Sequence, residues 1–328
     1  MPELPEVETV VRGLRLSLPG RTIGEVRFGK TDFVDDPGEI AERLPGLRIS
    51  DVARRGKFIF IGLRANGSSA PGAAPAASAS PGHLVIHLGM TGKLTVIHSG
   101  ESAPPHTHVF FALDDGRELR YTDIRRFGRM LFLPESRLAE FTRPLGKEPL
   151  EISAEEFCQR LGSRRTRIKA LLLDQKVLGG VGNIYADESL FRARLHPARI
   201  AQNLTKKELL ALHGAVRRVL EEAIRSRGSS ISDYVDSEGK RGNFQLRHRV
   251  YQRDGKPCAR CKAIIRRIIV AGRSSHFCPR CQPTPRSRKV AKKASKQRMH
   301  TDKNLRKKRR KKREKKKEIG GSSAIASS

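Results

Sequence analysis

The sequence predicts an α+β protein of several domains, and three features of the chain support this class. An apolar stripe at helical spacing comes first, short strand-like runs separated by turn residues follow it, and the second half carries helical segments and a cysteine-rich hairpin. Runs of strands followed by runs of helices are typical of α+β folds and not of alternating α/β folds. At 328 residues the chain is long enough for more than one hydrophobic core.

The first helix is predicted over residues 5–18. Gly20 marks its end, and one face carries the apolar stripe Val7, Val10, Val11, Leu14 and Leu18. Pro2 stands ahead of this helix, directly behind the initiator methionine. A small second residue normally allows removal of that methionine, so the mature chain is expected to begin with the secondary amine of a proline.

The amine of Pro2 is a candidate nucleophile. An α-amine has a pKa of about 8 and a lysine side chain one of about 10.4, so more of the α-amine is unprotonated at neutral pH. A secondary amine that attacks a sugar C1′ forms an iminium, which acts as an electron sink. Glu3, Glu6 and Glu8 follow at once, and one of these carboxylates within reach of the amine could transfer a proton. Alternatively, Pro2 and Pro5 only start the helix, with acids in its first turn.

An amino-terminal β-sandwich domain is predicted over residues 1–133. Its eight strand-like runs are 22–28, 47–52, 57–63, 84–88, 93–97, 109–113, 118–121 and 129–133. Asp114-Asp115-Gly116 is a typical hairpin turn between two of them. Residues 64–82 are rich in Gly, Ala, Ser and Pro and lack the apolar content to fold, so they are predicted to be a disordered loop insertion.

A hinge over residues 134–150, rich in proline and charge, is predicted to lead into a helical domain over residues 151–243. Two of its four expected helices open with a capping box, at Ser153-x-x-Glu156 and at Thr205-x-x-Glu208. The glycines of residues 179–182 precede another helix start. Such glycines let backbone amides approach a phosphate, but without the lysine of a Walker motif the loop is a weak indication by itself.

A cysteine-rich segment, residues 244–282, contains two Cys-x2-Cys pairs, Cys258 with Cys261 and Cys278 with Cys281. This spacing predicts one structural Zn²⁺ with four cysteine ligands. The metal would stabilise a zinc-finger β-hairpin, and the first strand of this hairpin is expected over residues 264–270. Four thiolates leave no open position for water, so the metal would not be catalytic. Cys158 stands apart and is expected to be a small buried hydrophobe.

The charge of the chain points to a polyanion partner, nucleic acid first. There are 66 Lys and Arg residues against 34 Asp and Glu, a net charge of +32. Residues 286–318 hold 19 of these basic residues and 3 acids, so the tail over 283–328 is predicted to be disordered and polyanion-binding. It would be either a DNA tether or an extension without a role in the chemistry. No apolar run approaches the about 18–20 residues of a membrane span, and no signal peptide is expected.

Several of these stretches resemble the formamidopyrimidine-DNA glycosylases, the bacterial 8-oxoguanine repair enzymes. They are MPELPEVET at residues 1–9, DIRRFG at 123–128, GGVGNIYADE at 179–188 and the two cysteine pairs. Ile124 and Lys147 replace prolines of the family pattern. The resemblance implies an N-terminal β-sandwich, a helix–two-turn–helix DNA-binding domain and a zinc-finger hairpin. It also implies a monomer that acts on damaged double-stranded DNA in the bacterial cytoplasm, at the nucleoid, without a membrane.

The activity implied by the resemblance is that of a bifunctional DNA glycosylase and AP lyase, which removes oxidised purines (8-oxoguanine, formamidopyrimidines) in base-excision repair. Pro2 would form a Schiff base with C1′ while Glu3 supplies or relays a proton. Lys57 would donate a proton in β-elimination, and Arg273 would support δ-elimination. Taken alone, Lys57 is better explained as a solvated strand end.

Six further residues are DNA contacts by the same resemblance. Met90, Arg125 and Phe127 would fill the gap left by an extruded nucleotide, because extrusion costs a few kcal/mol that inserted side chains offset. The remaining contacts, to phosphate and backbone, would be His106, Arg164 and Asn183.

Two alternatives remain open at this point. An endonuclease VIII-like enzyme, which prefers oxidised pyrimidines, shares Pro2, Glu3, the lysine and the zinc hairpin. The residue identities at Leu4 and at Val7-Glu8-Thr9 favour the branch that removes oxidised purines. A catalytically silent, DNA-binding architectural protein would suit the tail and the zinc hairpin, but it would not need the intact set Pro2, Glu3, Lys57 and Arg273.

Overall fold

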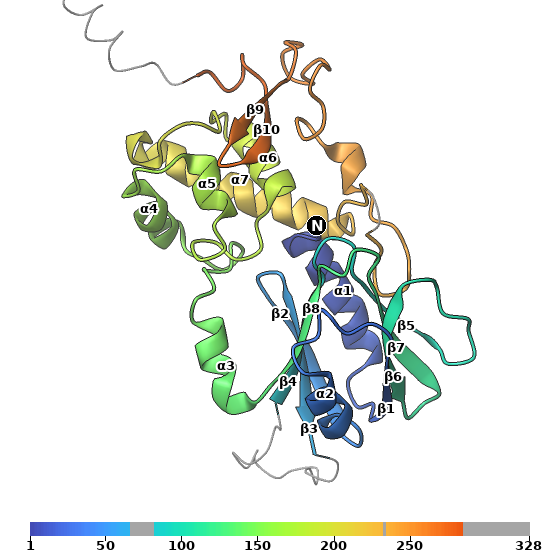
Figure 1. Cartoon of the computed structure of the whole chain (residues 1–328). Helices are drawn as coiled ribbons and strands as arrows, with labels where there is room; N and C mark the ends of the chain where they lie inside the picture. Colours follow the sequence, from blue (N-terminus) through green and yellow to red (C-terminus); the bar gives the residue numbers. More distant parts are fainter. Residues whose placement is uncertain (66–81, 232–233, 285–328) are drawn as a thin grey trace, which may run out of the picture. The chain divides into compact units, whose positions relative to one another are not determined.

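The amino-terminal helix forms where the apolar stripe predicts it. In the computed structural model, which describes residues 1–65, 82–231 and 234–284, α1 spans Leu4–Ser17 (Figure 1). Glu3 is its N-cap and forms a capping box with Glu6, which satisfies amides that would otherwise lack partners. The five stripe residues are fully buried, and Gly20, with a φ of 86°, lets the chain reverse after the helix.

Two four-stranded antiparallel sheets form the predicted sandwich, and all eight expected strands are present. The first sheet has the order β1-β6-β7-β5, with β1 (Ile23–Phe28), β5 (Lys93–His98), β6 (Thr107–Leu113) and β7 (Arg117–Thr122). The second has the order β2-β3-β4-β8, with β2 (Arg48–Arg55), β3 (Phe58–Arg64), β4 (Gly82–His87) and β8 (Arg129–Leu133). Side chains of α1 and of both sheets share one hydrophobic core, so burial of α1 fixes the chain end against the sandwich.

Two short helices are not predicted from the sequence, α2 (Pro37–Arg43) and α3 (Glu135–Thr142), although Asp36 as N-cap and Pro37 in the first turn are a start signal for α2. α3 lies inside the predicted hinge and covers the outer face of the second sheet, where Leu138 and Phe141 pack against Phe60. With 7 and 8 residues, neither helix is long enough to show a clear apolar stripe.

The predicted insertion and the tail fall largely outside the described residues. Arg64 ends β3 and Gly82 begins β4, so these two positions of the insertion belong to paired strands. Residues 66–81 of the insertion and residues 285–328 of the tail are not described. The domain bounds at 133, 150, 243 and 282 therefore stay predictions.

The four expected helices of the second half are present as α4 (Ala154–Gly162), α5 (Ile168–Leu173), α6 (Asn183–Arg192) and α7 (Lys206–Arg225), with a short 3₁₀ helix, η1 (Ala201–Asn203), before α7. Thr205 forms a complete capping box with Glu208 at the start of α7, as predicted. Leu4, although it belongs to α1, packs into the hydrophobic core of these helices. The amino terminus is therefore held between the sandwich and the helical half (Figure 1).

The last described segment is a β-hairpin of β9 (Arg266–Val270) and β10 (Arg273–Phe277), preceded by a 3₁₀ helix, η2 (Phe244–Arg247). The strand begins two residues later than the sequence predicts. Ala271 and Gly272 both have positive φ, which is the geometry of a tight two-residue hairpin turn. In the described part of the chain, no helix is both long and apolar enough to cross a membrane.

Candidate active site

A cavity of about 460 Å³ lies where the start of α1 meets the start of α6. Its wall includes Pro2, Glu3, Lys57 and Arg273, the four residues to which the resemblance assigns catalysis. These residues come from three separate segments: the chain end, the β2–β3 turn and the β9–β10 hairpin. The fold therefore brings all four candidate catalytic side chains to one place.

Glu3 is buried, and its carboxylate accepts hydrogen bonds from the amides that open α6. Gly182 N donates at 2.8 Å, Ile184 N at 2.9 Å and Tyr185 N at 3.4 Å. Burial raises the pKa of Glu3, although the ammonium of Lys57 and these amides oppose the shift. A carboxyl group with a raised pKa can hold a transferable proton close to neutral pH.

The glycine run of residues 179–182 receives the chain end. A Cβ atom at Gly182 would overlap the Glu3 carboxylate, and one at Gly180 would overlap the side chain of Leu4. Leu4 N also donates to the carbonyl of Gly180 at 3.0 Å. The sequence suggests a phosphate as the partner of the amides in this run. In the structure Gly179 N donates to the carbonyl of Lys147, Gly180 N to the side chain of Gln175, and Gly182 N to Glu3.

Lys57 is only 6 % exposed, which excludes a solvated strand end. Its turn is fixed by Glu148, which accepts from Gly56 N at 2.6 Å and pairs with Arg54 at 2.8 Å. Arg54 also pairs with Glu8 of α1 at 2.9 Å. Burial lowers the pKa of the Lys57 ammonium, with Glu3 and Glu6 opposing the shift, which brings a lysine closer to proton exchange at neutral pH.

Glu6 lies behind Glu3 and joins three segments. Its carboxylate accepts from Glu3 N at 2.8 Å, from Ser229 N at 2.7 Å and from the hydroxyl of Tyr185. Burial, and then the neighbouring charge of Glu3, raise the pKa of Glu6 to about 7. The sequence does not predict the contacts to Tyr185 and Ser229, because neither residue is near Glu6 in the chain.

The raised pKa of Glu6 predicts a pH-dependent stability. Glu6 takes up a proton on folding, so its contribution is fully present below pH 4.5 and is lost as the pH rises through about 7. Relative to Glu6→Gln, the wild-type free energy of unfolding should fall by about 3 kcal/mol across this interval. Urea unfolding of both proteins at several pH values measures the difference. Glu25→Gln, at an exposed acid of β1, is the control and should show no such trend with pH. If the difference in unfolding free energy between the wild type and Glu6→Gln does not change with pH, the raised pKa of Glu6 is contradicted.

Further polar residues in and near the cavity were not singled out by the sequence. Tyr251 and Ser229 line it together with Asn183, whose side-chain oxygen is buried without a hydrogen-bond partner among the described residues. His87 lies beside Lys57, and burial together with the Lys57 charge lowers the pKa of its imidazole to about 4. The ring is therefore neutral at physiological pH, and its Nδ1 accepts a hydrogen bond from Gly89 N at 3.1 Å.

Two neighbouring loops present the predicted wedge residues: the Met90 loop (residues 88–92) and the Phe127 loop (residues 123–128). Met90 is 39 % and Phe127 56 % exposed, and the guanidinium of Arg125 lies 4.5 Å from the centre of the Phe127 ring. Gly89 has a φ of 58°, and a Cβ atom there would overlap the Phe127 backbone, so the two loops are in contact. Exposed apolar side chains held this way are positioned for a macromolecular partner.

The remaining predicted contacts are spread more widely. His106 is exposed before β6, and its carbonyl accepts from Asp123 N at 3.0 Å, which places it next to the Phe127 loop. Arg164 is exposed between α4 and α5. Of the six predicted DNA contacts, Met90 and Asn183 line the cavity.

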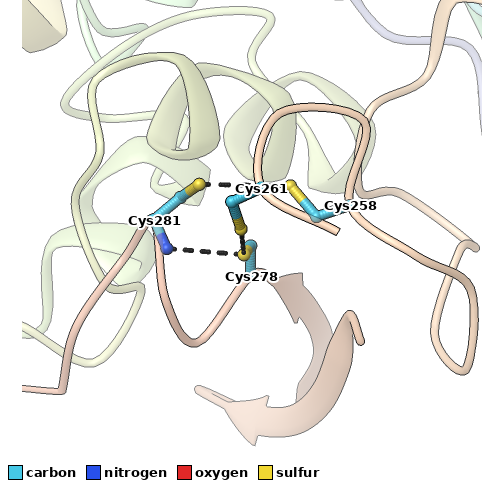
Figure 2. A group of neighbouring side chains, drawn as sticks. All are labelled: Cys258, Cys261, Cys278 and Cys281. Atoms are coloured by element: carbon cyan, nitrogen blue, oxygen red, sulfur yellow. Dashed lines mark hydrogen bonds between the residues drawn. The ribbon is translucent and has the colours of Figure 1, made fainter. Parts of the chain in front are cut away.

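The four predicted metal ligands converge, and Figure 2 shows their sulfur atoms turned toward one another. All four Sγ atoms lie within 4.8 Å of one another, and those of Cys261 and Cys278 are 3.4 Å apart. Four thiolates at this separation fit one tetrahedral Zn²⁺ with no open position. Cys158 packs partly buried against the helical core, and burial raises the pKa of its thiol, as expected of an inert residue.

A buried ion network ties this hairpin to the helices. Lys169 of α5 is fully buried; it pairs with Asp187 of α6 at 2.7 Å and donates to the carbonyl of Ser274 at 2.7 Å. Asp187 in turn accepts from His276 N at 2.8 Å. Arg273, next to Ser274 on β10, is thereby fixed relative to the cavity.

Loss of the metal should therefore weaken the DNA binding that the resemblance implies. We expect Cys261→Ser to lose its zinc and to bind a damaged duplex at least about tenfold more weakly, because the hairpin that carries Arg273 loses its staple. Elemental analysis and fluorescence anisotropy measure the two quantities. Cys158→Ser is the matched control and should change neither. A zinc-free Cys261→Ser protein with unchanged affinity would contradict the role of the site.

Family models match three stretches of the chain. The formamidopyrimidine-DNA glycosylase N-terminal domain matches residues 1–130, its H2TH domain residues 145–235, and the zinc finger found in FPG and IleRS residues 255–284. Among curated relatives, the formamidopyrimidine-DNA glycosylase of Solibacter usitatus is 48% identical over 286 residues, with 86% of this chain and 99% of the relative covered. That of Heliobacterium modesticaldum is 45% identical over 293 residues, with 86% and 100% covered.

Solved structures give the same result. MutM (Fpg) from Thermus thermophilus superposes with a TM-score of 0.73 at 40% identity, covering 87% of this chain and 100% of that one. Lactococcus lactis Fpg in complex with DNA containing an abasic site superposes with a TM-score of 0.77 at 30% identity, covering 86% and 100%.

Proposed function

The chain belongs to the formamidopyrimidine-DNA glycosylase family and is a zinc-containing DNA glycosylase and AP lyase of base-excision repair, and from this premise we propose how its own residues carry the chemistry. The observation that supports the proposal most directly is the single cavity shared by Pro2, Glu3, Lys57 and Arg273. We propose that it takes up an oxidised purine nucleotide extruded from the duplex.

The first step forms a bond between the chain end and the sugar. Removal of Met1 converts the Pro2 nitrogen from an amide to a secondary amine at the cavity wall, next to Glu3. This nitrogen attacks C1′, the bond between C1′ and the base breaks, and the base leaves with a proton. Glu3 supplies or relays that proton, which its buried carboxyl group is suited to hold. The bond between C1′ and O4′ then breaks, O4′ takes up a proton, and the opened sugar is joined to Pro2 as an iminium.

The second step cleaves the strand. The iminium withdraws electrons, so a proton leaves C2′ and the 3′ phosphate departs by β-elimination; δ-elimination then releases the 5′ phosphate. Lys57 acts as the proton donor of the β-elimination, and the guanidinium of Arg273 grips phosphate during the second elimination. The product is a one-nucleotide gap. The proximity of these two cations to Glu3 supports the assignment.

Met90, Arg125 and Phe127 occupy the space left by the extruded nucleotide, with Arg125 bonded to the orphaned base. Their exposure on two contacting loops supports this role. His106, Arg164 and Asn183 contact the DNA backbone. One chain supplies all four candidate catalytic side chains, which supports a monomer. We propose that the enzyme acts at the bacterial nucleoid, where its substrate lies.

The substrate proposal is tested by single-turnover excision from two duplexes, one with 8-oxoguanine and one with thymine glycol. We expect faster excision of 8-oxoguanine and a gap flanked by phosphates. A preference for thymine glycol would support the endonuclease VIII-like alternative instead. A chain that excises neither lesion while still binding both duplexes would be the architectural protein.

The basic tail contributes +16 of the net charge over residues 286–318. As a DNA tether, it should steepen the salt dependence of binding, because each neutralised phosphate releases counterions. A chain truncated after residue 284 should bind undamaged duplex more weakly at low salt, with a shallower salt slope and an unchanged single-turnover excision rate. An unchanged salt slope would show that the tail is an extension without this role.

A further inference from the structure

Asp123 lies beneath the Met90 loop and the Phe127 loop, and its side chain is 0 % exposed. The carboxylate accepts from four donors. Arg125 N at 3.2 Å and Gly128 N at 2.9 Å belong to its own loop. Thr91 Oγ1, at 2.5 Å, belongs to the Met90 loop, and the hydroxyl of Tyr121, at 3.1 Å, comes from β7.

Thr91 completes the connection between the two loops. Its Oγ1 donates to Asp123 and also accepts from Arg125 N at 3.1 Å, so one hydroxyl bridges both loops. In the part of the chain that the structure describes, Asp123 makes no ion pair. A buried carboxylate without a counter-charge is costly, so its fourfold hydrogen bonding points to a role in loop geometry.

We propose that Asp123 is a positioning residue that holds the Met90 loop and the Phe127 loop together as one preformed wedge. The inference rests on the proposed function of Met90, Arg125 and Phe127 as the side chains that fill the gap. Insertion competes with stacked and paired bases, and side chains that had to be ordered at that moment would lose part of their binding energy. Asp123 fixes both loops from below while leaving the three side chains exposed.

The test compares a substrate that requires extrusion with one that does not. Each oxygen of Asp123 accepts from one backbone amide and one hydroxyl, so the NH₂ group of Asp123→Asn faces two donors. The hydroxyl can rotate to accept, but the amide cannot, so at least one loop bond is lost. We expect single-turnover excision from a paired 8-oxoguanine duplex to slow by about 10–100-fold, as for other misplacements of about 1 Å. Borohydride trapping on a single-stranded abasic oligonucleotide should change by less than about threefold, because no base has to be extruded.

Three variants isolate the connection between the loops. Thr91→Val removes the bridging hydroxyl at nearly constant volume and should slow duplex excision in the same way as Asp123→Asn. Thr91→Ser restores the hydroxyl and should restore the rate. Tyr121→Phe removes a bond to Asp123 but leaves the loops joined, and it should keep the wild-type rate on both substrates. A fluorescent 2-aminopurine beside the lesion should report slower extrusion in Thr91→Val alone of these three.

The outcomes separate the inference from the proposal beneath it. If Phe127→Ala slows duplex excision while Thr91→Val and Asp123→Asn do not, the positioning role of Asp123 is wrong. If Phe127→Ala does not change the rate of duplex excision, the proposed gap-filling role of Phe127 is wrong, and the positioning role of Asp123 is then wrong as well. Equal losses on the duplex and on the single strand would show that Asp123 only maintains the fold. Should Asp123→Asn fail to fold, Thr91→Val decides the question.

Discussion

Glu3→Gln is expected to slow base excision by about 10³-fold, within the range that general acid–base groups contribute. Glutamine keeps the volume of Glu3 and one acceptor oxygen for the amides of α6, but it has no proton to supply to the leaving base. The loss should appear in the single-turnover rate with 8-oxoguanine duplex. The free energy of unfolding should change little, because removal of a buried charge offsets part of the lost hydrogen bonding.

A preformed abasic site is the control for Glu3→Gln. There the base has already left, so Schiff-base formation and strand cleavage should fall by a smaller factor than base excision does. Equal losses on both substrates would mean that Glu3 acts chiefly by holding α1 against α6. An excision rate within about tenfold of wild type would contradict its role in proton transfer.

A chain whose Pro2 nitrogen is blocked should lose at least about 10³-fold in both base excision and strand cleavage. An amide nitrogen shares its lone pair with the carbonyl group, so it is not a nucleophile. Retention of Met1 and acetylation of a processed chain both produce such an amide. Pro2→Gly is the informative control, because its primary amine can still form an imine and should keep part of the activity. Mass spectrometry of each preparation establishes the state of the chain end.

If an acetylated chain still cleaves at an 8-oxoguanine site, another residue must be the nucleophile. Lys57 is the amine to examine then, since it lines the same cavity and burial lowers its pKa. Lys57→Arg would separate the cases, because it keeps a cation but removes the amine.

Local patterns in the sequence are sufficient for most of the fold. Alternating apolar residues and turn signals predict all eight strands of the sandwich to within a few residues, and the stripe from Val7 to Leu18 predicts α1. The pairing of β1 with β6 has no local signal, since it joins segments far apart in the chain. The short helices α2 and α3 are missed because the core, and not their own periodicity, stabilises them.

In the candidate site, too, some residues can be predicted from the local sequence and others cannot. The zinc ligands are predictable because their spacing is local, and Pro2 and Glu3 because the stretch MPELPEVET that contains them resembles the family pattern. The partners that position them come from elsewhere in the chain. Glu148 fixes the Lys57 turn, Asp187 helps to fix the Arg273 hairpin, and Asp123 joins the two wedge loops. Each is a buried acid whose partner is set by tertiary packing, which a pattern in one sequence does not reveal.

The account depends on one bond, between the nitrogen of the processed chain end and C1′ of the damaged nucleotide. Borohydride reduction during the reaction with an 8-oxoguanine duplex makes this bond permanent, and peptide mapping by tandem mass spectrometry locates it. We predict a deoxyribose-derived adduct on the peptide that begins with Pro2, at its nitrogen. An adduct on Lys57 or on any other side chain, or strand cleavage without an adduct, would contradict the mechanism.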